Sequence, residues 1–221
     1  MKVSDFVKNV SNKYGPDKLE GAMLMLNIDR LLDNIIRWAF SLDGFHRGQP
    51  GLWSHCVLIA APFNGDSTPI LDCTIRDSKN RVIWNPTLLD DIDSIFGGNA
   101  GGIYSGKISD YDSENVKDCG VYFLPHISKD KRHQIVLEGQ RLQGQGYHYD
   151  LPGLVRELIR LLLGKTYSGN NKLLFCSAFL AMAYREALGL AWTVAPSVPT
   201  DDITEDDIWY SKTGITVPPA P

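Results

Sequence analysis

The sequence lacks the cysteine patterns that mark metal-binding and disulfide-rich proteins. Its 221 residues include four cysteines, Cys56, Cys73, Cys119 and Cys176, and none of them form a C-x-x-C pair or a zinc-finger spacing. A chain of this length buries enough apolar surface to fold without disulfides. We therefore expect reduced thiols, a cytosolic setting and no metal or other cofactor.

Long apolar runs and an excess of positive charge are also missing. The most apolar segment, residues 22–40, carries four charged residues within it, so it cannot span a bilayer. Lys and Arg number 22 against 26 Asp and Glu, and the net charge of −4 argues against a general nucleic-acid binder. Residues 1–15 have no apolar region typical of a secretory signal. We expect a cytoplasmic protein without a transmembrane segment, and export by another route, peripheral membrane contact and the oligomeric state stay open.

Two helices are predicted in the N-terminal part of the chain. The first covers residues 4–14 and is closed by Gly15 and Pro16. The second covers residues 18–40, where apolar residues such as Leu24, Ile28 and Leu31 recur at helical spacing. An amphipathic helix of this kind packs against a core, or it acts as a lid or a lipid-facing surface. The chain is thus divided into an N-terminal helical segment, 1–44, and a domain at 45–221.

The remaining pattern predicts an antiparallel sheet packed on helices, which is an α+β fold. Apolar stretches bounded by turn residues predict strands at 52–61, 70–76, 82–84 and 116–124. Helices are expected at 128–143, at 154–163 and from residue 176 onward. The acidic, glycine-rich stretch 90–102 and the stretch 144–150 are expected to form a loop and a turn. The proline-rich segment from residue 193 is expected to be an extended surface tail.

Cys176 is a candidate nucleophile because it falls on the first turn of a predicted helix. Backbone N–H groups of a first turn lack intrahelical partners, and the positive end of the helix dipole lies there, so a thiolate is favoured over a thiol. A thiol nucleophile needs a base, and His55 is the histidine that falls inside an apolar strand, where burial is costly without a partner. Asp72 lies in the next predicted strand, and the strand register decides whether the two share a face.

Each of these residues has a structural alternative. Free cysteines are often small buried hydrophobes, and a core histidine can be bonded to a backbone carbonyl. Cys56 and Cys73 follow His55 and Asp72 directly, so in regular strands they point to the opposite face. We expect these two cysteines in the core and not as metal ligands.

The motifs and their order resemble those of the permuted papain-like amidases of the YiiX/YaeF type. These enzymes are related to the NlpC-type cell-wall peptidases and to the lecithin:retinol acyltransferase-like enzymes. The motifs that carry the resemblance are Trp53-Ser54-His55 with Ile59, Leu71-Asp72-Cys73, residues 146–150, and Phe175-Cys176-Ser177. Together they span roughly residues 47–207.

The resemblance implies a papain-like fold whose chain order is circularly permuted, so that the histidine strand precedes the cysteine helix. It implies Cys176 as the nucleophile, His55 as the general base and then acid, and Asp72 as the group that orients His55. The family more often has Glu where this chain has Asp72. Trp53, Tyr149, Asp150 and Ser177 would then line the substrate site. The longer helical segment before residue 40 lies outside the resemblance.

The hypothesis that follows is a cysteine hydrolase that cleaves an amide, ester or thioester through an acyl-enzyme. Its substrate is either a lipid acyl group or a cell-wall peptide, and the two predicted apolar helices at 18–40 and 154–163 favour the lipid slightly. A non-catalytic binding module on the same fold is the alternative. A serine hydrolase and a zinc hydrolase are disfavoured, because no G-x-S-x-G and no H-E-x-x-H is present.

Overall fold

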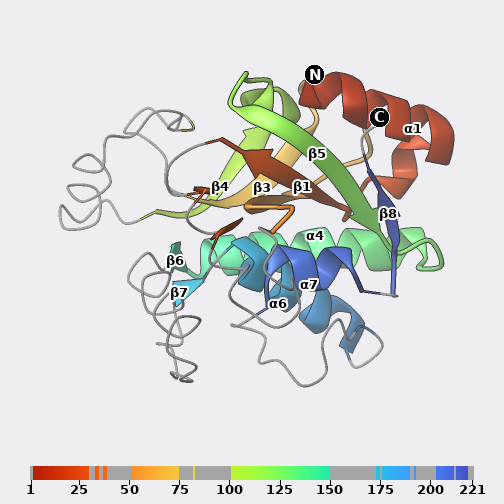
Figure 1. The fold of residues 1–221 in the computed structure, drawn as a ribbon. Coiled ribbons are helices and arrows are strands. Elements are labelled where there is room, and N and C mark those ends of the chain that lie inside the picture. Colours follow the sequence, from red (N-terminus) through yellow and green to blue (C-terminus); the bar gives the residue numbers. More distant parts are fainter. Residues whose placement is uncertain are drawn as a thin grey trace.

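One eight-stranded β-sheet organises the described part of the chain (Figure 1). The computed structural model describes residues 2–29, 33–34, 37–38, 51–74, 82, 101–149, 173–174, 176–189, 192, 203–211 and 213–218. Within these residues the sheet has eight strands in the order β7-β6-β4-β3-β2-β1-β5-β8. They are β1 (Met23–Ile28), β2 (His55–Ile59), β3 (Pro69–Thr74), β4 (Gly102–Lys107), β5 (Val116–Phe123), β6 (His148–Tyr149), β7 (Leu173–Leu174) and β8 (Ile215–Val217). In the run β4-β3-β2-β1-β5-β8 each strand is antiparallel to the next. Strands β6 and β7 are parallel to each other.

Helices cover both faces of the sheet, which confirms the predicted α+β class (Figure 1). One face carries α1 (Val3–Tyr14) and the 3-10 turn η2 (Ile108–Tyr111), and a further 3-10 turn, η1 (Pro16–Lys18), follows α1. The other face carries α4 (Lys129–Gly144), α6 (Cys176–Leu188) and α7 (Glu205–Trp209). We call these the α1 face and the α6 face. No helix among the described residues is long and apolar enough to cross a bilayer.

The predicted helix at 18–40 is wrong over Met23–Ile28, which forms the central strand β1. Every residue of β1 except Asn27 is buried, because the strand has a neighbour on each side and a helical layer on each face. A short, mostly apolar run of this kind suits a buried strand as well as a helix, and the sheet decides between them. Later in the predicted helix, residues 33–34 and 37–38 are described and are helical. Through β1, the N-terminal segment shares one sheet with the strands of the predicted domain.

Most other elements agree with the sequence patterns. The predicted helices at 4–14, at 128–143 and from 176 correspond to α1, α4 and α6, and the strands at 52–61, 70–76 and 116–124 to β2, β3 and β5. Strand β4 was not predicted, because glycines begin and interrupt it. The turn at 144–150 is wrong at its end, where β6 pairs with β4. The predicted helix at 154–163 and most of the strand at 82–84 lie outside the described residues.

The segment from residue 193 is not simply an extended tail. Where it is described, it forms the short helix α7 and the edge strand β8. A capping box starts α7, since Asp207 N donates to Thr204 Oγ1 at 3.2 Å and Thr204 N donates to Asp207 Oδ2 at 3.0 Å. Reciprocal caps and acidic residues in the first turn stabilise a helix even when it is short. This helix brings further side chains to the candidate site.

Candidate active site

Cys176 is the first residue of α6, as predicted. Alanines at 178, 181 and 183 are buried, so α6 packs closely against β2 and β3 on the α6 face. The Cys176 side chain is only 4% exposed. Its sulfur therefore lies between the start of the helix and the sheet, next to N–H groups that have no partner within the helix and to the positive end of the helix dipole.

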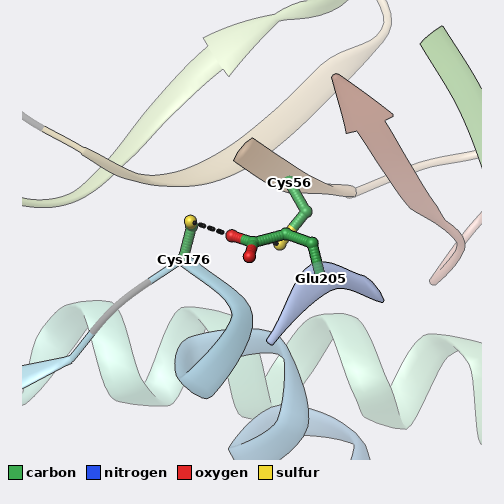
Figure 2. Close-up of side chains that lie close together, drawn as sticks. All are labelled: Cys56, Cys176 and Glu205. Atoms are coloured by element: carbon green, nitrogen blue, oxygen red, sulfur yellow. Dashed lines mark hydrogen bonds between the residues drawn. The ribbon is translucent and has the colours of Figure 1, made fainter. Parts of the chain in front are cut away.

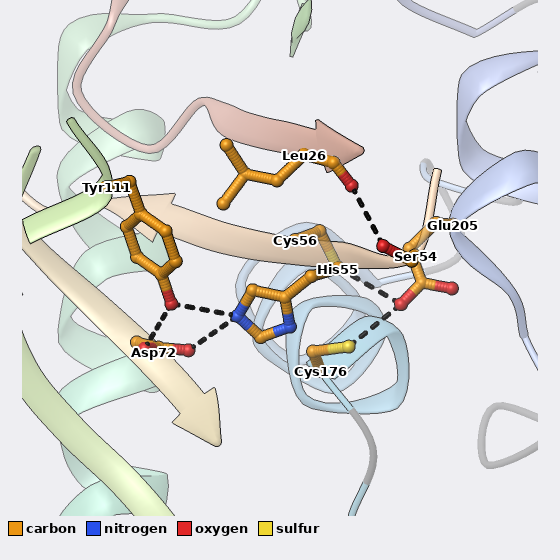
Figure 3. Close-up of polar contacts among 8 residues, drawn as sticks. All are labelled: Leu26, Ser54, His55, Cys56, Asp72, Tyr111, Cys176 and Glu205. Carbon is orange, nitrogen blue, oxygen red and sulfur yellow. Dashed lines mark hydrogen bonds and ion pairs between the residues drawn. The ribbon is translucent and has the colours of Figure 1, made fainter. Parts of the chain in front are cut away.

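His55 and Asp72 are in contact, as predicted from their places in neighbouring strands. The Nε2 atom of His55 lies 2.9 Å from Asp72 Oδ1. Tyr111, at the end of η2, adds a third group, since its hydroxyl donates to Asp72 Oδ2 at 2.6 Å and lies 3.0 Å from His55 Nε2 (Figure 3). All three side chains are buried, so the carboxylate and the hydroxyl hold the imidazole ring in one orientation.

The histidine and the cysteine meet where strands β2 and β3 separate. The β2–β3 ladder consists of the pairs Leu58–Leu71 and Ile59–Ile70, and His55 and Asp72 lie beyond it. Alternation along the strands places both on the α1 face, whereas Cys176 comes from the α6 face. Figure 3 shows the second ring nitrogen of His55, Nδ1, on the side of Cys176. The imidazole thus lies between an orienting carboxylate and the thiol.

The charges of the cysteine and the histidine stabilise each other. Burial would lower the pKa of His55, but the negative charges of Cys176 and Asp72 and hydrogen bonds to both raise it well above 6.5. A hydrogen bond from Cys56 lowers the pKa of Cys176, burial opposes this, and the charge of His55 lowers it further, so that it lies well below 9.0. Both directions favour a thiolate beside an imidazolium.

This pairing is the arrangement expected of a thiol nucleophile with its base. No family model, no curated protein and no solved structure matches the chain. The likeness to permuted papain-like enzymes is therefore carried by sequence motifs alone.

Two residues that the sequence analysis did not assign to the site lie against Cys176. Its Sγ forms a 2.8 Å hydrogen bond with Oε1 of Glu205, and the Sγ of Cys56 lies 4.0 Å from the same oxygen. The three side chains converge from α6, α7 and β2 (Figure 2). Cys56 points away from His55, as predicted, but the face to which it points is the one that carries α6. Its expected place in the core is correct, and that part of the core includes the candidate nucleophile.

Within the part of the chain that the structure describes, Cys56, Cys176 and Glu205 form a donor set that could hold a metal ion, since their donor atoms all lie within 4.8 Å of one another. Two thiolates and a carboxylate suit Zn²⁺. Two ligand atoms of one tetrahedral zinc, however, are about 3.5 Å apart. The 2.8 Å contact between Cys176 and Glu205 is much shorter and fits a shared proton better than a shared metal ion.

Hydrogen bonds and a ring contact attach helix α7 to Leu52 and Trp53, which precede His55. Asp206 accepts hydrogen bonds from the backbone N–H groups of Leu52, at 3.0 Å, and Trp53, at 3.2 Å. The ring of Trp209 packs edge-on against that of Trp53, with centroids 4.7 Å apart. These contacts fix α7 so that the preceding residue, Glu205, is directed at the sulfur.

The predicted substrate-contacting residues are only partly placed. Trp53 and Ser177 are buried, at 0% and 3% exposure, and Trp53 packs against Trp209. The indole N–H of Trp53 has no hydrogen-bond partner among the described residues. Tyr149 lies in β6, and Asp150 is outside the described residues. A role of these four residues in substrate binding remains a prediction.

Proposed function

We propose that this protein is a cysteine hydrolase that cleaves an amide, ester or thioester, on a papain-like fold with permuted chain order. The observation that carries the proposal is the placement of the His55 imidazole, held by Asp72 through one nitrogen and facing Cys176 with the other. A buried ion pair at the start of a helix is costly to maintain and is typical of an activated thiol.

In the proposed reaction the Cys176 thiolate attacks the substrate carbonyl carbon and forms a C–S bond. The carbonyl electron pair becomes an oxyanion, which the backbone N–H of Cys176 at the start of α6 stabilises. The adduct collapses, the bond to the leaving group breaks, and protonated His55 gives its proton to that group. Neutral His55 then takes a proton from water, and the hydroxide releases the acid and regenerates the thiolate.

Asp72 and Tyr111 act through His55 as positioning residues. Asp72 keeps Nε2 as the hydrogen-bonded, protonated nitrogen and stabilises the imidazolium by its charge. Tyr111 donates to Asp72 and thereby fixes the carboxylate. The shorter side chain of Asp, where the family more often has Glu, still reaches His55 at 2.9 Å.

The substrate class has two candidates, a lipid acyl group and a cell-wall peptide. One argument for a lipid was the amphipathic helix predicted at 18–40, and over Met23–Ile28 that segment is a buried strand of the sheet. The other argument, the apolar helix predicted at 154–163, lies outside the described residues, so the slight preference for a lipid rests on the sequence of that stretch alone. The burial of Cys176, at 4% exposure, also suits the alternative of a binding module that keeps the fold without catalysis.

Product analysis separates these functions. A bacterial envelope extract that holds sacculi and phospholipids is treated with wild type, with Cys176→Ala, or with Cys119→Ala as a control for a buried thiol on β5. Fatty acids or lysophospholipids that require Cys176 identify a lipid acyl hydrolase, and stem-peptide fragments identify a cell-wall amidase. Equal products from wild type and Cys176→Ala would rule out this nucleophile, and a Cys176 that alkylates no faster than an ordinary thiol would favour the binding module.

A further inference from the structure

Glu205 is a buried acid whose side chain lies in hydrogen-bond contact with the candidate nucleophile. It is 4% exposed and is the first residue of α7, and its Oε1 lies 2.8 Å from Cys176 Sγ. Burying a carboxylate beside a thiolate is unfavourable unless one of the two carries a proton. The contact between Glu205 and Cys176 therefore implies that a proton lies on one of the two groups.

The ionisable groups around Glu205 determine where that proton lies. Burial, and then the charge and hydrogen bond of Cys176, raise the pKa of Glu205 well above 4.5, while the charge of His55 opposes this. The pKa of Cys176 is lowered by hydrogen bonds from Cys56, His55 and Glu205 and by the charge of His55. The pKa of Cys56 is raised by burial, so this thiol is neutral and also donates to the cluster. These directions agree in placing the proton on the carboxyl group.

We propose that Glu205 is a further catalytic residue, a carboxylic acid whose O–H donates first to the Cys176 sulfur and then to the oxyanion of the substrate. The proposal rests on the hydrolase function above and names the second oxyanion donor for that site. The oxyanion forms on the carbon bonded to Sγ, so an oxygen that already lies 2.8 Å from Sγ is within reach of it.

The step is balanced without any further reactant. As the sulfur lone pair forms the C–S bond, the sulfur loses its negative charge and is no longer a good acceptor for the Glu205 O–H. The carbonyl oxygen gains that charge, so the hydrogen bond moves from sulfur to oxygen. Glu205 keeps its proton throughout, and the proton for the leaving group comes from His55. When the adduct collapses, the hydrogen bond returns to its starting acceptor or to solvent.

The alternative to a donor role for Glu205 is a purely structural role of α7. In that case Glu205 would matter only because it belongs to a helix that Asp206 ties to Leu52 and Trp53. Asp206→Asn weakens this attachment and leaves the Glu205 carboxyl group unchanged. It is therefore the matched variant for the structural role.

Infrared difference spectroscopy tests the protonation state without a substrate. At neutral pH the wild-type minus Glu205→Gln spectrum should contain the C=O stretch of a protonated carboxylic acid, which a carboxylate lacks. Glu20→Gln removes another buried glutamate, which is bonded to His133 Nδ1 at 2.9 Å, and serves as the control. Carboxylate bands in place of the acid band in the Glu205 difference spectrum would overturn the proposal, whatever the protein hydrolyses.

Hydrolysis of p-nitrophenyl acetate tests the donor role. Glu205→Ala should lower kcat about 10²–10³-fold with little change in KM, because the contact to the oxyanion exists only in the transition state. Glu205→Gln should stay within about tenfold of wild type, since a neutral amide still donates a hydrogen bond. Asp206→Asn should change kcat less than Glu205→Ala does.

The outcomes distinguish this proposal from the hydrolase function on which it rests. If Cys176→Ala abolishes turnover while both Glu205 variants match wild type, the donor role is wrong and the hydrolase stands. Equal losses in Glu205→Ala, Glu205→Gln and Asp206→Asn, with native circular dichroism, would assign Glu205 to structure. Full turnover in Cys176→Ala would remove the hydrolase itself.

Discussion

Replacing Asp72 by alanine removes the charge that holds His55 in place. The carboxylate is fully buried, lies 2.9 Å from His55 Nε2 and accepts the Tyr111 hydroxyl proton at 2.6 Å. Removing one partner of a buried ion pair costs about 3–5 kcal/mol. We expect Asp72→Ala to lower the free energy of unfolding by that amount at neutral pH, which is a large share of the roughly 5–15 kcal/mol that a domain has.

The same variant should keep measurable activity. The Tyr111 hydroxyl lies 3.0 Å from His55 Nε2, so it remains a hydrogen-bond partner for the ring after Asp72 is lost. We expect kcat to fall about 10²–10⁴-fold, the range that a well-placed general acid–base contributes. Adding Tyr111→Phe should remove the remaining activity, and it should cost more stability in the Asp72→Ala background than in wild type.

The pH dependence of the free energy of unfolding tests whether the charge pair of His55 and Asp72 causes this loss of stability. The raised pKa of His55 contributes stability that is fully present below pH 6.5 and is lost as pH rises through the folded pKa. Urea unfolding should therefore give a gap between wild type and Asp72→Ala that narrows as pH rises through that folded pKa. Asp112→Ala is the control. Asp112 accepts a hydrogen bond from the backbone N–H of Ser4, in the first turn of α1, at 2.9 Å, and this contact involves no histidine. A gap under about 1 kcal/mol, as for an exposed ion pair, or one independent of pH, would refute the reasoning.

Three further predictions concern the cysteines and α7. Iodoacetamide should label Cys176 with a midpoint well below pH 9.0, and His55→Ala should move that midpoint upward, which peptide mass mapping measures; an unmoved midpoint contradicts the pairing. Cys119, whose pKa burial raises to about 12, should stay unlabelled below pH 9.0 in the folded protein and react in urea. Gly120→Ala would place a Cβ 2.5 Å from the ring of Trp209, so urea unfolding should show a loss of about 1–3 kcal/mol, whereas an unchanged midpoint would mean that this ring is free to move.

The sequence patterns predicted the elements whose ends are marked by turn residues or caps. Strands β2, β3 and β5 follow from apolar stretches bounded by turn residues, and helices α1, α4 and α6 follow from helical spacing and caps. Strand β1 was missed because no glycine or proline separates it from the apolar residues at helical spacing that follow it up to residue 40. Its identity as a strand depends on its pairing with β2 and β5, which is a property of the assembled sheet.

The site residues likewise divide into those that the sequence indicated and those that it did not. His55, Asp72 and Cys176 stood out because each is a chemically active side chain in an apolar or helix-start setting. Glu205 did not, although the sequence Thr204 to Asp207 carries the signature of a capping box, because nothing local indicates that this helix lies against Cys176. The sequence placed Cys56 on the correct face of β2. The helix that packs on that face, however, is determined by the tertiary structure and not by the local pattern.

The attachment of α7 to the start of β2 has a consequence for how the site is made. The hydrogen bonds from Leu52 and Trp53 to Asp206 join residues 154 and 153 positions apart, and the Cys56–Glu205 contact spans 149. Such contacts close very large loops, and folding slows as the average span of contacts grows. The His55–Asp72 pair, only 17 positions apart, can form with the sheet, whereas the docking of α7 against the start of β2 has to close loops of 149 to 154 positions. During synthesis the polypeptide therefore holds His55 and Asp72 well before Cys176 and Glu205 are made, so the candidate site is complete only after the C-terminal part of the chain has docked.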